Sequence, residues 1–359
     1  MARLANFFTA ASTLLIAATA TFAQAPTAAK AETKTKPIAA VIYSTRGDEK
    51  VHVLAADDLR LLGSIDSKAG LHELALDSTG RFVMGSAYGG PNPGHQPADN
   101  RLVVIDLAAN AVHRTITLEG MQRPNDIAFK PGSFEAFVTV ESPPHILRVD
   151  AESGEVAKFP IKHKNGHMLA LSSDAKTVYV SHVQPGSLTV LDTATGAETK
   201  SITLPLGAEG MTCSPDGRSV WIASHAEGRV SVVDTETNEV SQSIIAPGMP
   251  FRVRISPDGK LVAIAAPQAG AVAFIETREP TRIQYVDTNV FENKPISRVM
   301  TPTSIAFSPD GTSLFAVCEG EDSRIVAIDV ATRKVRAHTL AKGPIADAMT
   351  TGVIQWAGT

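Results

Sequence analysis

The feature that most constrains this chain is a repeat of about 42 residues. Short apolar runs that end on an acidic residue recur along it, and four consecutive runs end at Asp150, Asp192, Asp234 and Glu276, each 42 residues after the last. A second series of turns recurs with them, as "SSDAKTV", "SPDGRSV", "SPDGKLV" and "SPDGTSL". Two independent series that keep one period indicate a structural repeat.

Seven copies of the unit can be counted, because equivalent apolar runs also end at Ala55, Asp106 and Asp329. Each copy is rich in β-branched residues with turn residues between, which is typical of four short strands. One such sheet cannot bury both of its faces, so the copies must pack face to face around an axis. The sequence therefore predicts an all-β fold, a seven-bladed β-propeller of four-stranded antiparallel blades. The alternative, an open β-solenoid, has shorter repeats and needs terminal caps.

The two ends of the repeat region each hold part of one copy. Residues 38–65 supply the second, third and fourth strands of a copy and lack the first, whereas residues 343–350 look like a first strand with no complete copy after it. We expect the C-terminal strand to complete the N-terminal blade. Closure of this kind removes two exposed sheet edges at once.

The repeat "SPDGRSVWIAS…GRVSVVDTETNEV", with its neighbour "SDAKTVYVSHVQPGSLTVLDTATGAE", resembles the YVTN-type seven-bladed propeller repeat. The resemblance covers residues 37–350 and implies an exported bacterial propeller. It implies no single function, because such propellers serve as binding scaffolds, as surface proteins and, in lactonase relatives, as enzymes.

The N-terminus reads as a targeting segment. Arg3 precedes an apolar stretch, and Ala23-Gln24-Ala25 forms an A-x-A cleavage site. We therefore expect residues 1–25 to be a signal peptide, residues 26–36 a flexible linker and residues 37–359 a single propeller domain. No second long apolar span follows, so we expect a periplasmic or secreted protein with no membrane span after cleavage.

Composition and motifs narrow the function classes. A formal net charge of −4 and a pI near 6.2 give no electrostatic footprint for nucleic acid. The sequence has no C-x-x-C-H motif for covalently attached haem and no G-x-S-x-G motif for a serine hydrolase. We expect a monomer, and no motif in the sequence identifies a cofactor.

Two insertions interrupt the repeat. Residues 86–100 lengthen a connection between second and third strands, and residues 289–300 lengthen a connection between blades. In a propeller both connections open on the face opposite the "SPDG" turns, whose Asp and Gly are turn chemistry. Long loops on a rigid scaffold are the usual place for binding. We expect a small ligand or protein partner on this insertion-bearing face.

The first positions of the inner strands carry polar groups where apolar ones are expected. Because one such position comes from each blade, they should converge on the mouth of the axial channel. The candidate ligand-binding residues there are His72, Glu73, Asn125, Asp126, His167, Glu209 and Arg252, with His182 and His225 near the ends of second strands on the same rim.

These mouth residues have two interpretations. They can hydrogen-bond to each other and to channel water, or they can hold a divalent metal. The segment "RPNDIAF" (123–129) is similar to the "RPNGLAF" segment of gluconolactonase-like propellers, although Asp126 replaces its Gly. The resemblance implies Glu73, Asn125 and Glu209 as metal ligands, for Ca²⁺ or Mg²⁺ by their oxygens or for Zn²⁺ if histidine joins them.

Three functions follow. The first is an exported, non-catalytic binding propeller. The second is a metal-dependent hydrolase of the lactonase type, in which the ion polarises a carbonyl or activates water. The third, an electron-transfer partner of a redox enzyme, rests only on the shared propeller architecture.

Overall fold

The computed structural model describes residues 36–45, 48–90, 97–164, 166–292, 294–295, 300–320, 322–342 and 345–356. The chain divides into two units, Met1–Lys34 and Thr35–Thr359, and the described residues all belong to the second. The predicted signal peptide, and the linker up to residue 35, lie outside the described residues and stay predictions.

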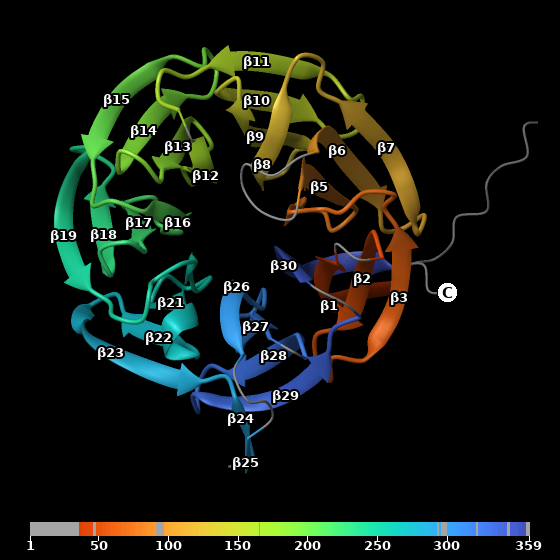
Figure 1. The fold of residues 1–359 in the computed structure, drawn as a ribbon, viewed down its shortest axis with the longest axis vertical. Helices are drawn as coiled ribbons and strands as arrows, with labels where there is room; N and C mark the ends of the chain where they lie inside the picture. The colour runs from red at the N-terminus through yellow and green to blue at the C-terminus, as the bar shows by residue number, and fades with distance from the viewer. Residues whose placement is uncertain are drawn as a thin grey trace, which may run out of the picture. The chain divides into compact units, whose positions relative to one another are not determined.

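The second unit is the seven-bladed β-propeller that the repeat predicts (Figure 1). Each blade is a four-stranded antiparallel sheet, and its strands run in order from the centre of the ring to the circumference. In the first four blades the strands are β30 (Ile345–Trp356), β1 (Lys36–Thr45), β2 (Lys50–Ala55) and β3 (Leu61–Asp66); β4 (Glu73–Leu76), β5 (Phe82–Gly89), β6 (Ala98–Asp106) and β7 (Ala111–Thr117); β8 (Gln122–Phe129), β9 (Glu135–Ser142), β10 (His145–Asp150) and β11 (Val156–Pro160); and β12 (Gly166–Leu171), β13 (Thr177–His182), β14 (Ser187–Asp192) and β15 (Glu198–Thr203). In the last three they are β16 (Ala208–Cys213), β17 (Ser219–Ser224), β18 (Arg229–Asp234) and β19 (Glu239–Ile245); β20 (Val253–Ile255), β21 (Leu261–Ala266), β22 (Ala271–Glu276) and β23 (Glu279–Asp287); and β26 (Thr301–Phe307), β27 (Ser313–Glu319), β28 (Arg324–Asp329) and β29 (Lys334–Leu340).

The ring closes as predicted, through the C-terminal strand. β30 pairs antiparallel with β1, from Thr45 opposite Ile345 to Lys36 opposite Trp356, and so supplies the inner strand of the N-terminal blade (Figure 1). The closing strand is longer than the predicted 343–350, because the pairing continues along the whole of β1. Ile354 and Trp356, beyond the predicted end, are buried in the core.

The hydrophobic core lies between blades. Among the described residues there are seven apolar clusters, and each joins two neighbouring blades. One of them packs Val41 and Tyr43 of β1 against Phe315 and Val317 of β27, so the interface that closes the ring is as apolar as the others. Every blade is thus held on both faces, which is the physical reason that the repeat must close.

The repeated turns are structural, as the sequence indicates. In the turn 214–219, the Ser214 hydroxyl donates to the Asp216 carboxylate at 2.6 Å and accepts from the Ser219 N–H. The same pattern recurs at Ser256 and Ser308. The carboxylates of these aspartates accept hydrogen bonds within their own turns.

The second insertion, residues 289–300, is described only in part. Its described part includes the hairpin of β24 (Val290–Phe291) and β25 (Lys294–Pro295), which projects at the circumference beside β29 (Figure 1). Phe291 contacts His338 of β29 edge-on, with ring centroids 5.0 Å apart. The expectation that both insertions open on one binding face stays a prediction, because residues 91–96 and 296–299 lie outside the described residues.

One 3₁₀ turn, Pro267–Ala269, is the only helical element in the ranges described. No helix in those ranges has the length and hydropathy needed to span a membrane.

Candidate functional site

β-bulges place the polar side chains at the channel mouth, the end of the axis where the inner strands begin. In three blades, two residues of the inner strand lie between paired positions that enclose only one residue of the second strand. The inner strand is therefore one residue longer than its neighbour at this point. A bulge redirects side chains that strict alternation would send between the blades. The bulged pairs are Asn125–Asp126, His167–Met168 and Glu209–Gly210.

Hydroxyl groups on the second strands fix two of these bulges and tie their blades to the next ones. The Thr139 hydroxyl accepts from the Asp126 N–H at 2.9 Å and donates to the carbonyl of His167 in the following blade at 2.7 Å. Ser181 repeats the arrangement, accepting from the Met168 N–H and donating to the carbonyl of Glu209 at 2.8 Å. The backbone of the mouth is therefore positioned before any ligand arrives.

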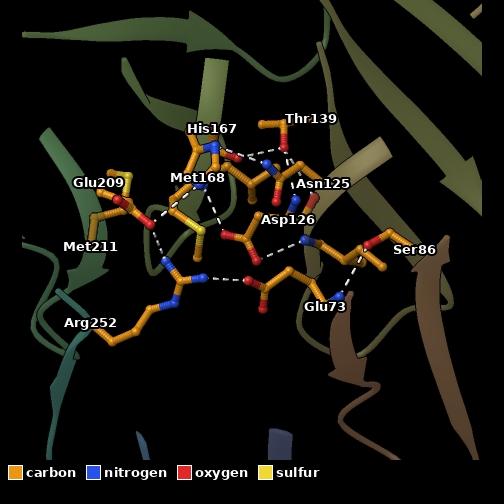
Figure 2. Close-up of polar contacts among 12 residues, drawn as sticks. Glu73, Ser86, Asn125, Asp126, Thr139, His167, Met168, Glu209, Met211 and Arg252 are labelled. Carbon is orange, nitrogen blue, oxygen red and sulfur yellow. Dashed lines mark hydrogen bonds and ion pairs between the residues drawn. The ribbon is translucent and has the colours of Figure 1, made fainter. Parts of the chain in front are cut away.

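Arg252 bridges two glutamates across the axis. Its Nη1 donates to Glu209 Oε1 at 3.0 Å and its Nη2 to Glu73 Oε1 at 2.6 Å, so that one guanidinium joins three blades (Figure 2). The Arg252 side chain is only 1% exposed and the two carboxylates 6% and 7%. At this burial an isolated charge is costly, and the ion pairs offset that cost.

His167 is the second cation of the mouth. Its Nε2 lies 3.3 Å from Glu209 Oε1 and its Nδ1 3.6 Å from Glu141 Oε1. Burial alone would lower the pKa of His167, but hydrogen bonds to Glu141 and Glu209 outweigh it and raise this pKa to about 10. The imidazole is therefore protonated at neutral pH.

Asn125 lies between His167 and Glu141. Its amide nitrogen is 2.9 Å from His167 Nδ1 and donates to Glu141 Oε1 at 3.3 Å. The hydrogen bond from Asn125 is one of the contacts that lower the pKa of Glu141.

The glutamates around these cations are ionised. Burial would raise the pKa of Glu209, but the hydrogen bond from His167 and the charges of His167 and Arg252 hold it below its ordinary value. The pKa of Glu141 is likewise lowered against burial, by His167 and by the hydroxyl of Tyr88. We call Glu73, Asn125, Glu141, His167, Glu209 and Arg252 the mouth network.

The first insertion connects directly to this network. Tyr88, near the end of the lengthened strand β5, donates its hydroxyl to Glu141 Oε2 at 2.7 Å. The guanidinium of Arg123 lies over the Tyr88 ring, 4.8 Å from its centroid, and His72 packs on the same ring with centroids 4.9 Å apart. A cavity of about 230 Å³ between His72, Tyr88 and Arg101 opens beside the mouth.

The other predicted residues lie around the network. Asp126 is one layer deeper, where its carboxylate accepts the N–H groups of Ile127 and Leu169 and burial raises its pKa. His225 contributes from the rim, with Nε2 3.4 Å from Glu209 Oε2. His182 is turned away from the centre, because its ring bonds to Thr189 and to the carbonyl of Lys164 inside its own blade.

The predicted metal ligands are brought close together, but a guanidinium lies between two of them. Arg252 bridges Glu73 and Glu209, and Asn125 contacts His167 and Glu141. The part of the chain that the structure describes contains no group of three or more His, Cys, Asp or Glu side chains arranged to hold a metal ion. The geometry therefore gives the hydrolase hypothesis no support.

The chain matches the model of a known protein family. The model of the cytochrome D1 heme domain matches residues 132–352, which is more than half of the chain. The resemblance to the YVTN-type family is not confirmed as a family assignment, although the fold it implies is the one observed. A comparison with curated proteins finds no match.

Many solved structures share the fold. A chain of hydrazine synthase from Kuenenia stuttgartiensis matches with a TM-score of 0.66 at 16% identity, over 80% of this chain and 96% of that one. A functionally unknown protein from Desulfotomaculum acetoxidans DSM 771 matches with a TM-score of 0.69 at 13% identity, over 88% and 99% of the two chains. At these identities the likeness shows the fold alone.

Proposed function

We propose that this chain, which belongs to the cytochrome D1 heme domain family, binds no haem at its channel mouth. The protein is an exported β-propeller that binds a small polar ligand or a protein partner at the mouth network. The observation that carries this proposal is the ring of prepositioned charges, held by bulges and hydroxyl bonds, beside the first insertion.

A haem does not fit the donor set of the mouth. An axial histidine must be neutral with one ring nitrogen directed at the iron. His167 is a cation whose two ring nitrogens face Glu209 and Glu141, and both ring nitrogens of His182 are used inside its blade. The Nε2 of His225 faces Glu209, and the guanidinium of Arg252 is held between Glu73 and Glu209.

The charges of the mouth favour a ligand with a cationic or hydrogen-bond-donating group. The mouth network holds three carboxylates, Glu73, Glu141 and Glu209, and two cations, Arg252 and His167, and the guanidinium of Arg123 lies beside it over Tyr88. The carboxylate of Glu141 is 20% exposed and accessible from the mouth, whereas Arg252 is shielded by its partners. A half-buried acceptor of this kind contributes most when a charged donor completes it.

The ligand proposal predicts selective binding of small amines. In isothermal titration of the mature protein, we expect diamines such as putrescine to bind, neutral diols of equal length to bind at least about tenfold more weakly, and Glu141→Gln to lose about tenfold in affinity for the amine. Hemin added under the same conditions should form no one-to-one complex with a ligated-haem absorption spectrum.

Glu155→Gln is the matched control, since this exposed glutamate lies in a blade turn between β10 and β11 and should leave amine binding unchanged. Equal affinity of amines and diols, or of Glu141→Gln and wild type, would contradict the ligand chemistry. A stoichiometric hemin complex that is lost in His225→Gln would contradict the proposed absence of haem from the mouth.

Export gives a separate prediction. The Arg3 n-region, the apolar stretch and the A-x-A site motivate a signal peptide, so the native protein from the bacterial envelope should begin near Pro26. N-terminal sequencing of that protein is the check, and a native chain that retains Met1 would overturn export by this route.

A further inference from the structure

A second cavity lies at the opposite end of the axis from the mouth network. It has a volume of about 670 Å³ and is lined by the far ends of inner strands from several blades and by the "SPDG" turns, with Pro215, Pro257 and Pro309 among its lining residues. The mouth network contributes none of the residues that line it. It is therefore a distinct place on the molecule, and nothing in the proposed function uses it.

Arg254 lines this cavity as a cation without an ion pair. Its Nη1 donates to the carbonyls of Met211 at 3.3 Å and Val253 at 3.0 Å, and no carboxylate of a described residue lies within ion-pair distance of it. Removal from water lowers the pKa of Arg254, opposed in part by the charge of Asp126. A guanidinium in such a setting gains more from an anion than one in water.

The other charged side chain that lines the cavity is that of Asp77. The Asp77 carboxylate accepts the N–H groups of Thr79, Arg81 and Phe82 and so belongs to its own turn. It therefore does not neutralise Arg254.

The rest of the wall has an apolar part and a polar part. Leu74, Leu76, Ile127, Phe129, Phe307 and Met349 line the cavity, and so do Ser78, Ser256, Ser308, Thr350 and Thr351. A cavity with apolar side chains and a guanidinium that donates to backbone carbonyls matches a ligand with an apolar body and a single anionic end. We propose that this cavity binds an amphiphilic monocarboxylate, whose carboxylate pairs with Arg254 and whose hydrocarbon part packs on the apolar side chains of the wall.

Octanoate is a suitable probe, with octanol and octyl phosphate as comparisons. In isothermal titration of the mature protein we expect octanoate to bind at least about tenfold more tightly than octanol. Arg254→Met should abolish this preference, and Arg254→Lys should keep part of it, because the charge remains but the planar pair of donors is lost. Equal binding of octanoate and octanol, or an unchanged preference in Arg254→Met, would overturn the proposal. Binding of octyl phosphate alone would overturn the carboxylate class.

Val353→Trp tests the location of the site without changing Arg254. The proposal can therefore be tested even if the Arg254 variants do not fold. Val353 is 50% exposed and lines the cavity, so the larger side chain should weaken octanoate binding several-fold and its fluorescence should change on binding. Val240→Trp, at a 41% exposed position on the outer strand β19, is the matched control and should show neither effect. Identical behaviour of the two variants would place octanoate elsewhere and refute the site.

Discussion

Arg252→Met is expected to lower the free energy of unfolding by about 3–5 kcal/mol, as removal of one partner from a buried ion pair does. The guanidinium is 1% exposed and bonds to Glu73 and Glu209, so its loss leaves two carboxylates close together in a site that water hardly reaches. Chemical denaturation of wild type and variant at neutral pH measures the difference.

Three comparisons make that result specific. Arg60→Met, which removes an exposed ion pair with Asp58, should cost less than about 1 kcal/mol. Neutralising both partners, as in the triple variant with Glu73→Gln and Glu209→Gln, should recover part of the loss. A chelator should not change the wild-type melting temperature. Near-wild-type stability of Arg252→Met, or a chelator-sensitive wild type, would show that another cation holds these carboxylates.

Removal of residues 343–359 is expected to prevent stable folding. The deletion takes away β30, all of its pairing with β1, and the buried side chains of Met349, Ile354 and Trp356. Three buried side chains of this size stabilise by about 1.5–3 kcal/mol each, before any loss at the two blade interfaces is counted. That sum is comparable to the whole stability of a typical domain, about 5–15 kcal/mol.

Circular dichroism melting of the truncated chain is the measurement. A chain that lacks only residues 357–359 is the control and should melt with the wild type, because β30 ends at Trp356. Ile354→Ala gives an intermediate case, with an expected loss of about 2–5 kcal/mol from the cavity it leaves in the core. An unchanged melting curve for the long truncation would contradict closure of the ring by β30.

The fold could be predicted from the sequence because the residue pattern of one blade is repeated along the chain. The spacing of Asp150, Asp192, Asp234 and Glu276 repeats one blade, and the incomplete copies at the two ends predict the closing strand. The end of that strand could not be predicted. Residues 351–356 pair with Lys36–Val41 at the other end of the chain, and neither segment alone shows how far the pairing extends.

The site was predictable only as a set of positions. Polar residues at the start of inner strands mark the mouth, but the pairing of Arg252 with Glu73 joins residues 179 positions apart and depends on the closed ring. The bulges at Asn125, His167 and Glu209 depend on register between strands, which one copy of the repeat does not reveal.

Several side chains that shape the two sites could not be identified from the sequence pattern. Thr139 and Ser181 read as ordinary alternating strand residues, although their hydroxyls link neighbouring blades. Tyr88 belongs to an insertion without an equivalent in other copies, and His182 satisfies the rim pattern while its ring bonds to Thr189 instead. Arg254 is a lone charge on an inner strand, and only the closed channel shows the cavity that it lines.

The central claim is that fixed protein cations, Arg252 and His167, hold the carboxylates of the mouth. The folded-state pKa of His167, about 10, lies above the ordinary value of 6.5. The contribution of its imidazolium to stability is therefore fully present below pH 6.5 and is lost as the pH rises from there through about 10. A His167 that ligates a metal or a haem would instead be neutral across this range.

The most direct measurement is the ¹⁵N NMR titration of the histidine rings in the mature protein, from about pH 6 to about pH 11, with the His167 signals assigned by their loss in His167→Gln. The mouth network predicts that both ring nitrogens of His167 keep imidazolium shifts above pH 8 and titrate near pH 10. A neutral imidazole at pH 7, or titration near 6.5, would contradict it.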